Sequence, residues 1–167
     1  MTFSKKHTLT VALLTAATVA VPFVLRAADI HVAVTPSINE RFVKVKPVSE
    51  AGRGDYVAFC RPLHIGNIPR GGKCPDGTIP LVKRVIAAKG DIVMFTPTEI
   101  RVIPGDGGEP KFYSAPHHDP KLPHPGWGQN IFVDVDQVVV IGDHVHSVDS
   151  RYFGLVGAEF DAKDGGV

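Results

Sequence analysis

Residues 80–91 read PLVKRVIAAKGD, and this stretch decides the fold class. Most of its apolar residues are β-branched or small, and Gly90-Asp91 closes it with a turn signal. Similar short runs rich in Val, Ile and Phe, each bounded by Gly, Pro or Asp, lie at 30–35, 41–48, 55–60, 79–88, 92–95, 99–103, 131–135 and 137–141. The pattern predicts a mostly β domain built from short strands.

The composition is that of a globular chain with many turns. The 167 residues are 44% hydrophobic and 21% charged, and they include 17 Gly and 14 Pro. This length allows one domain with a small appendage. A net charge of +1 gives no basic face, so we expect no nucleic-acid partner.

The basic charge of the first 28 residues contrasts with the rest of the chain. Lys5, Lys6 and Arg26 are charged, no acid is present, and residues 8–25 form an uncharged, mostly apolar run. An 18-residue helix spans about 27 Å, close to the thickness of a hydrocarbon core. We predict a membrane anchor over 1–28, a folded body over 29–160 outside the cytoplasm, and a flexible tail over 161–167. A cleaved export signal is the alternative.

The two cysteines, Cys60 and Cys74, bracket a loop rich in Gly and Pro. In an oxidising compartment we expect them to form a disulfide, which for a loop of about 15 residues contributes about 3 kcal/mol. A reactive thiol or half of a metal site is the other interpretation.

Three stretches carry candidate chemistry. Ser37 follows a predicted strand, although it also suits a polar turn. Lys83 lies among apolar neighbours, and burial would lower its pKa, so that at a pKa of ~8 about 10% is a neutral base at pH 7. A lysine on the polar side of an edge strand is the alternative. Asp149 and Arg151 are two residues apart, on one face of an extended chain, and could pair.

A metal site is the competing hypothesis. The polar, proline-rich stretch 105–128 is long enough to be a functional or flexible insertion. Histidines occur there and before Asp149, at His117, His118, His124, His144 and His146, with Asp119 beside the first group. Zinc needs three or four converging ligands, and the sequence shows no such convergence. We predict no metal and no cofactor.

Four pieces of the chain together resemble one family. TPSI at 35–38, RGDYVAF at 53–59, KRVIAAKGD at 83–91 and GDHVHSVDSRYFG at 142–154 follow the order of the boxes of bacterial type I signal peptidases. More closely they resemble the plasmid conjugative-transfer maturation peptidases of the TraF type, as does the cysteine pair ahead of the lysine box.

The resemblance implies a coiled antiparallel β domain of signal-peptidase type with an N-terminal transmembrane helix. It implies Ser37 as nucleophile and Lys83, rather than Lys89, as general base. Asp149 is counted as catalytic in the TraF-type branch, and it would orient the base region. The supporting roles implied are Thr35 at the oxyanion, Ser147 on the lysine, and Arg151 paired with the aspartate.

The implied protein is a serine endopeptidase of the bacterial inner membrane with its catalytic domain in the periplasm. Its substrate would be an exported, pilin-like precursor, matured by cleavage or cyclisation beside other conjugation proteins. A general type I signal peptidase and a non-enzymatic, membrane-tethered pilus or secretion scaffold are the alternatives. Signal peptidases usually have Met-x-Pro-Thr after the serine, whereas this chain has Ile38, Asn39, Glu40 and Arg41. Glu40 therefore puts the substrate preference in question.

Overall fold

A computed structural model describes residues 30–32, 38–40, 42–62, 65–118 and 120–162, together with positions 18 and 20. Thr35, Ser37 and almost all of the predicted anchor lie outside these residues, as does most of the predicted tail. Within the described ranges no helix has both the length and the apolarity that a membrane crossing requires.

The larger sheet of the described chain has six strands. Their order is β1 (Ile30–Val32), β2 (Phe42–Lys46), β3 (Tyr56–Phe59), β4 (Leu81–Ala87), β9 (Gln137–Ile141) and β10 (Val156–Gly157). All neighbouring pairs are antiparallel except β2 and β3, which run parallel. The seven-residue β4 is central, and both of its faces are buried along most of its length.

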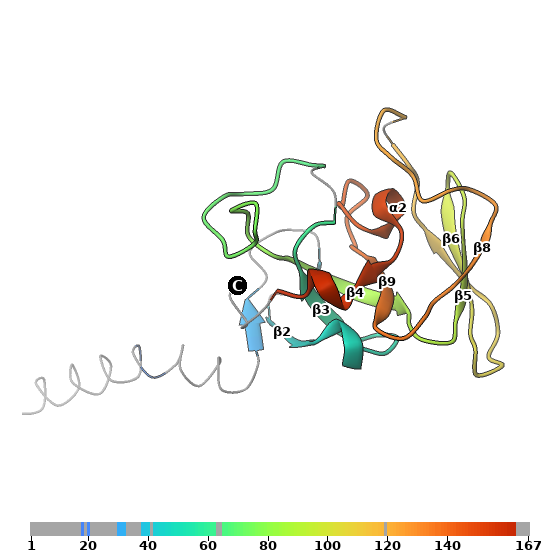
Figure 1. Cartoon of the computed structure of the whole chain (residues 1–167), viewed down its shortest axis with the longest axis horizontal. Coiled ribbons are helices and arrows are strands. Elements are labelled where there is room, and N and C mark those ends of the chain that lie inside the picture. The colour runs from blue at the N-terminus through green and yellow to red at the C-terminus, as the bar shows by residue number, and fades with distance from the viewer. Residues whose placement is uncertain are drawn as a thin grey trace, which may run out of the picture.

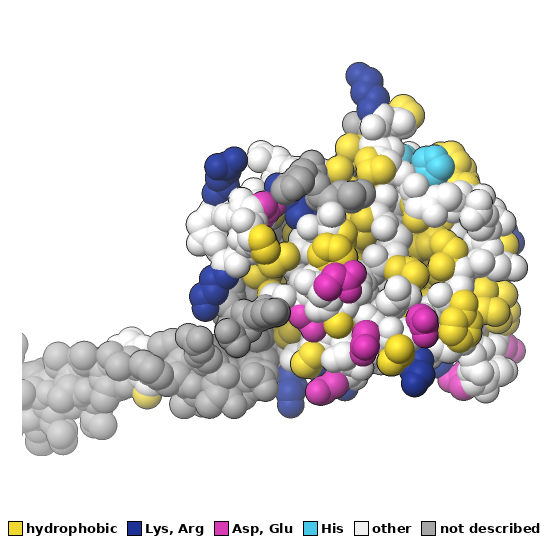
Figure 2. Space-filling model, viewed as in Figure 1, with side chains coloured by type: hydrophobic (Ala, Val, Ile, Leu, Met, Phe, Trp, Pro, Cys, Tyr) yellow, Lys and Arg dark blue, Asp and Glu magenta, His cyan; other side chains and the backbone are white. Residues whose placement is uncertain are grey.

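A second, four-stranded sheet is inserted in the sequence between β4 and β9. Its order is β7 (Lys111–Ser114), β6 (Glu99–Ile103), β5 (Ile92–Phe95) and β8 (Asn130–Phe132), with antiparallel pairing throughout. Figure 1 shows this sheet at one end of the folded body, beside β4 and β9. Its outer face is partly apolar, since Phe112 and Phe132 are exposed, and Figure 2 shows apolar side chains over the same part of the molecule.

The described helices are short. The α-helix α2 (Ser150–Phe153) follows β9, and the 3-10 turns η1 (Val48–Glu50) and η2 (Ala158–Phe160) lie near the ends of β2 and β10. Figure 1 shows α2 close to the inserted sheet, above β9. This placement matters because α2 carries residues of the candidate site.

Three apolar clusters hold the fold together. The first joins the two sheets, with Ile86 and Val139 on one side and Phe95 and Val102 on the other. The second lies on the face of the six-stranded sheet covered by η1, α2 and η2, and includes Phe59, Leu81, Val85, Val140 and Val156. The third is small and consists of Ile38, Val43, Ala58 and Val82.

The structure confirms the prediction of a mostly β body. The predicted runs 92–95, 99–103 and 137–141 coincide with β5, β6 and β9. Within the stretch 105–128, which was expected to be a functional or flexible insertion, residues 111–114 form β7. That strand is an edge strand whose residues are largely exposed, so it leaves no apolar pattern in the sequence.

The disulfide prediction is confirmed. Cys60 and Cys74 are bonded, with their Cα atoms 5.5 Å apart, so the free-thiol and metal-ligand interpretations are wrong. Cys60 follows directly after β3, and its N–H donates to the carbonyl of Phe160. Beside the disulfide, Arg61 Nε donates to Asp76 Oδ2 at 2.7 Å. The loop is thereby fixed to the rim of the six-stranded sheet.

Candidate active site

The central strand β4 buries a lysine. Lys83 is 1% exposed and pairs in register with Val57 of β3. By strand alternation its side chain shares a face with Leu81 and Val85, which belong to the second apolar cluster. The interpretation of Lys83 as a solvated residue on an edge strand is therefore wrong, because β4 is covered on both edges by β3 and β9. Lys89, the other lysine of the box, is exposed.

The surroundings of Lys83 change its protonation. Burial away from water disfavours the ammonium and lowers the pKa of Lys83 from 10.5 to about 8. The carboxylates of Asp149 and Asp143 oppose this shift, and the guanidinium of Arg151 adds to it. At a pKa near 8 about a tenth of the side chain is a neutral amine at pH 7, which can accept a proton.

Asp149 and Arg151 form a buried, bidentate ion pair, at 0% and 4% exposure. Arg151 Nε lies 2.8 Å from Asp149 Oδ1, and Nη2 lies 2.9 Å from Oδ2. The predicted ion pair is thus confirmed. The expectation that it forms on one face of an extended chain is wrong. Asp149 is the N-cap of α2 and accepts the backbone N–H of Arg151 at 3.2 Å, so the two meet in the first turn of a helix.

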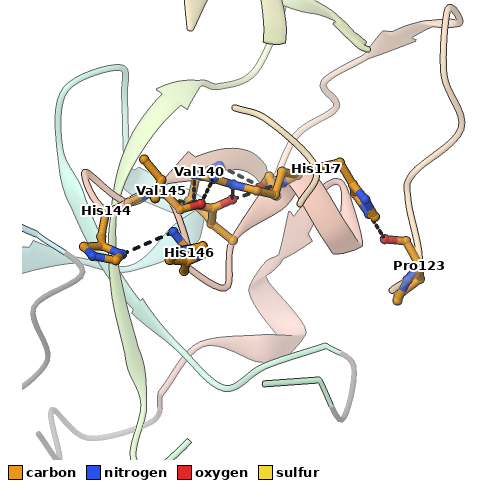
Figure 3. A network of polar contacts seen from close by, with 10 residues as sticks. His117, Pro123, Val140, His144, Val145 and His146 are labelled. Carbon is orange, nitrogen blue, oxygen red and sulfur yellow. Dashed lines mark hydrogen bonds and ion pairs between the residues drawn. The ribbon is translucent and has the colours of Figure 1, made fainter. Parts of the chain in front are cut away.

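Further hydrogen bonds fix this pair to β9. Gly142 N–H donates to Asp149 Oδ2, and Val140 N–H donates to the Ser150 hydroxyl, both at 2.9 Å. Arg151 Nη1 donates to the carbonyl of Val145. Figure 3 shows this network around Val140 and Val145. Because every bond joins α2 or its cap to residues 140–145, the orientation of the carboxylate is set by the backbone.

Ser147 lies in the same loop and is buried. Among the residues that the structure describes, its Oγ is the one buried side-chain polar atom without a hydrogen-bond partner. A buried hydroxyl without a partner costs free energy, typically about 1–3 kcal/mol, so such an atom in a folded protein calls for an explanation.

The residues just after Ser37 are fixed beside β4. Ile38 is buried and belongs to the third apolar cluster with Val82, the residue before Lys83. Asn39 N–H donates to Asp143 Oδ2 at 2.9 Å, and the other oxygen of that carboxylate accepts Arg84 Nη2 at 3.0 Å. Sequence reasoning missed Arg84 and Asp143. Their one signal was their place inside the KRV and GD boxes.

Glu40 has a partner in the folded chain. Tyr56 Oη donates to Glu40 Oε2 at 2.7 Å. Partial burial, with the neighbouring Glu40 carboxylate, raises the pKa of Tyr56 to about 12, so the phenol stays a donor. Whatever approaches residues 38–40 therefore meets a carboxylate that already accepts one hydrogen bond.

The described histidines contact one another through their rings. Among the described residues, which exclude Asp119, no group of three or more His, Cys, Asp or Glu is placed to hold a metal ion. Instead the ring centroids of His118 and His146 lie 5.0 Å apart, and those of His144 and His146 lie 5.6 Å apart. Nothing in this arrangement supports the metal hypothesis.

The body also has a pocket of about 460 Å³ that does not contain the buried lysine. It opens between the disulfide loop and the C-terminal segment, where Cys60, Asp76 and Phe160 contribute to its lining. None of the candidate site residues lines it. The chemistry of the candidate site therefore lies at buried side chains between β4 and α2, and not in this pocket.

Comparison with known families identifies the class of protein. A family model described as signal peptidase, peptidase S26, matches residues 4–160. The chain therefore belongs to the signal peptidase family, whose members are serine peptidases that act on exported precursor proteins. Comparison with curated proteins found no match.

Proposed function

We propose that this protein is a membrane-anchored Ser–Lys peptidase in which Ser37 is the nucleophile and Lys83 the general base. The observation that carries the proposal is the burial of Lys83 in the central strand, where its pKa is lowered to about 8. A lysine is costly to bury in its charged form, and a lowered pKa is what a lysine needs to act as a base near neutral pH.

The position of Ser37 in the chain supports its role. Ser37 is joined by one peptide bond to Ile38, which packs in the same cluster as Val82, the neighbour of Lys83. Consecutive Cα atoms are about 3.8 Å apart, so the packing of Ile38 against Val82 supports a role for its neighbour Ser37 near β4. The hydrogen bond from Asn39 to Asp143 ties the same segment to the loop that holds Asp149.

The proposed reaction begins with transfer of the Ser37 hydroxyl proton to the neutral Lys83 amine. The serine oxygen attacks the scissile carbonyl carbon, and the tetrahedral oxyanion is held by the Ser37 backbone N–H with help from Thr35. The new ammonium then returns the proton to the leaving amine as the C–N bond breaks, which leaves an acyl ester on Ser37. Water next gives a proton to Lys83, its oxygen adds to the ester, and the serine leaves with that proton.

Two neighbours would keep the base in place. The Ser147 hydroxyl, which lacks a partner in the described chain, is available to hydrogen-bond the Lys83 amine. The Asp149 carboxylate is held by Arg151 and Gly142. Its negative charge favours the ammonium form of Lys83 and keeps the pKa of Lys83 from falling further. We assign Asp149 the role of orienting and tuning the base.

Within the family we propose the TraF-type branch, with a pilin-like precursor of conjugative transfer as substrate and other conjugation proteins as neighbours. The disulfide just ahead of the lysine strand supports this assignment. The disulfide and the apolar run 8–25 support an anchor in the bacterial inner membrane with the catalytic domain in the periplasm.

The test of the catalytic pair is processing of a candidate pilin precursor co-expressed with the full chain. Ser37→Ala and Lys83→Ala are expected to lower the rate by at least about 100-fold, since a general base contributes about 10²–10⁴. Lys89→Ala is the matched control, because Lys89 belongs to the same box and is exposed. Processing at the wild-type rate by either site variant would refute the Ser–Lys mechanism.

Mass spectrometry of the product separates the remaining possibilities. Attack of water on the acyl ester gives a linear product, whereas attack by the amino end of the substrate gives a ring lighter by one water. Cleavage of an unrelated precursor with an ordinary export signal, and not of the pilin, would favour a general signal peptidase. Binding of the precursor without cleavage by the wild-type chain would favour the scaffold.

A further inference from the structure

Residues 115–118 and 120–128 are the described parts of the proline-rich loop between β7 and β8. His117 N–H donates to the carbonyl of Pro97, and Gly128 N–H donates to the carbonyl of Phe95, both at 2.9 Å. The two ends of the loop are therefore anchored to the backbone of β5 and of the turn that follows it. The segment between these ends couples the position of the four-stranded sheet to that of the residues which the loop contacts.

The loop touches the short helix of the candidate site. The ring centroid of His117 lies 4.9 Å from that of Tyr152, which is buried in α2. Pro125 packs against Gly154, which ends the helix, so closely that a Cβ on Gly154 would lie 2.9 Å from the Pro125 Cβ. Gly154 also has a φ of 76°, which disfavours any side chain there.

The imidazole of His117 is itself braced. Its Nε2 forms a 2.9 Å hydrogen bond with the carbonyl oxygen of Pro123, and its ring contacts Trp127 at 5.8 Å between centroids. Trp127 in turn stacks on His124 at 4.2 Å. Figure 3 shows His117 and Pro123 on one side of the polar network and His144 and His146 on the other.

These contacts converge on a helix of only four residues. Arg151 and Tyr152 are consecutive in α2, and Asp149 is its N-cap, so a shift of Tyr152 moves the ion pair. We infer that His117 is a positioning residue for the candidate active site, acting through Tyr152 to hold Asp149 and Arg151 in place. The inference rests on the proposed function.

The test compares His117→Ala with Phe112→Ala in full-length protein that processes the precursor. Phe112 is an exposed aromatic residue on the preceding strand and contacts Arg101 rather than α2, so it is a matched control. Displacing a catalytic group by about 1 Å costs up to ~100-fold, so we expect kcat of His117→Ala to fall by about 10- to 100-fold with KM unchanged. The control is expected to keep the wild-type kcat.

The pH profile provides a readout that simple loss of stability would not move. Asp149 affects the pKa of Lys83 more strongly than Arg151 does and in the opposite sense, so loosening the pair should move the acid limb of kcat to lower pH. His117→Phe keeps a ring against Tyr152 and is expected to restore most of kcat, which also covers the case in which the alanine variant folds poorly.

Two results would overturn the inference. One is a folded His117→Ala variant with the kcat and pH profile of the wild type, and the other is a folded His117→Phe variant as slow as the alanine variant. If Lys83→Ala abolishes processing in the same assay, the proposed function stands while the inference fails. If Lys83→Ala processes normally, the proposed function fails first.

Discussion

Replacing the buried lysine by an apolar residue should make the protein more stable while it abolishes processing. Lowering a lysine pKa from 10.5 to about 8 corresponds to about 3 kcal/mol of unfavourable free energy for the charged form. Lys83 is almost wholly buried, so little of this is screened by water. Methionine has a similar length and no charge, and we expect Lys83→Met to raise the free energy of unfolding at pH 7 by up to about 3 kcal/mol.

The sign of the pH dependence follows from the same shift. Between about pH 8 and pH 10.5 the unfolded chain still holds the Lys83 proton that the folded chain has released, so wild-type stability rises with pH. The advantage of Lys83→Met should therefore be full below pH 8 and vanish above about pH 10.5.

Thermal unfolding of the full-length wild type and Lys83→Met in detergent micelles at pH 7 and pH 10.5 measures both effects. For a chain of this size, about 3 kcal/mol corresponds to a rise in Tm of about 6–12 °C. Lys89→Met, at an exposed position, should leave Tm unchanged. A Tm for Lys83→Met at or below the wild-type value at pH 7 would refute the account of Lys83 as an unfavourably buried cation.

Three further predictions follow from the geometry. The rate of precursor processing at low substrate should rise about tenfold per pH unit below pH 8 and level off near pH 9, and a midpoint near 6.5 would point to a histidine instead. Asp149→Asn leaves the buried Arg151 guanidinium without its partner and should lower the free energy of unfolding by about 3–5 kcal/mol, measured by urea unfolding. In protein that still folds, the acid limb of the processing rate should move to lower pH, because the carboxylate no longer raises the pKa of Lys83. The double variant Cys60→Ser with Cys74→Ser should lose about 3 kcal/mol in the same assay, whereas equal midpoints before and after reduction of the wild type would contradict this.

Local apolar patterns predicted several strands with a buried face and missed the exposed strand Lys111–Ser114. The strand Glu99–Ile103 alternates between buried and partly or wholly exposed residues, so its run was recognisable from the sequence. The strand Lys111–Ser114 buries no face, and the helix Ser150–Phe153 is too short for a helical period. Their existence depends on pairing with β6 and on the Asp149 cap, which are properties of the folded chain.

The candidate site shows the same division. The resemblance singled out Lys83 and Asp149 because each lies in a recognisable box. The contacts of Asp143 with Asn39 and Arg84 join residues 104 and 59 positions apart, and no local signature announces such contacts. The burial of Lys83 likewise depends on β3 and β9, which lie far apart in the chain but adjacent to β4.

The insertion of one sheet between two neighbouring strands of the other bears on how such proteins can diversify. The chain leaves the six-stranded sheet after Ala87 and returns in β9, where Val139 is the pairing partner of Ala87. Neighbouring strands are only about 4.8 Å apart, so the inserted sheet can be lengthened, trimmed or exchanged by recombination while the surrounding frame keeps its register. His117 belongs to the inserted segment. Each exchange would therefore also change the contact that this segment makes with the helix that holds Asp149 and Arg151. Grafting a different inserted sheet could then alter kcat while the residues that carry out the reaction stay unchanged.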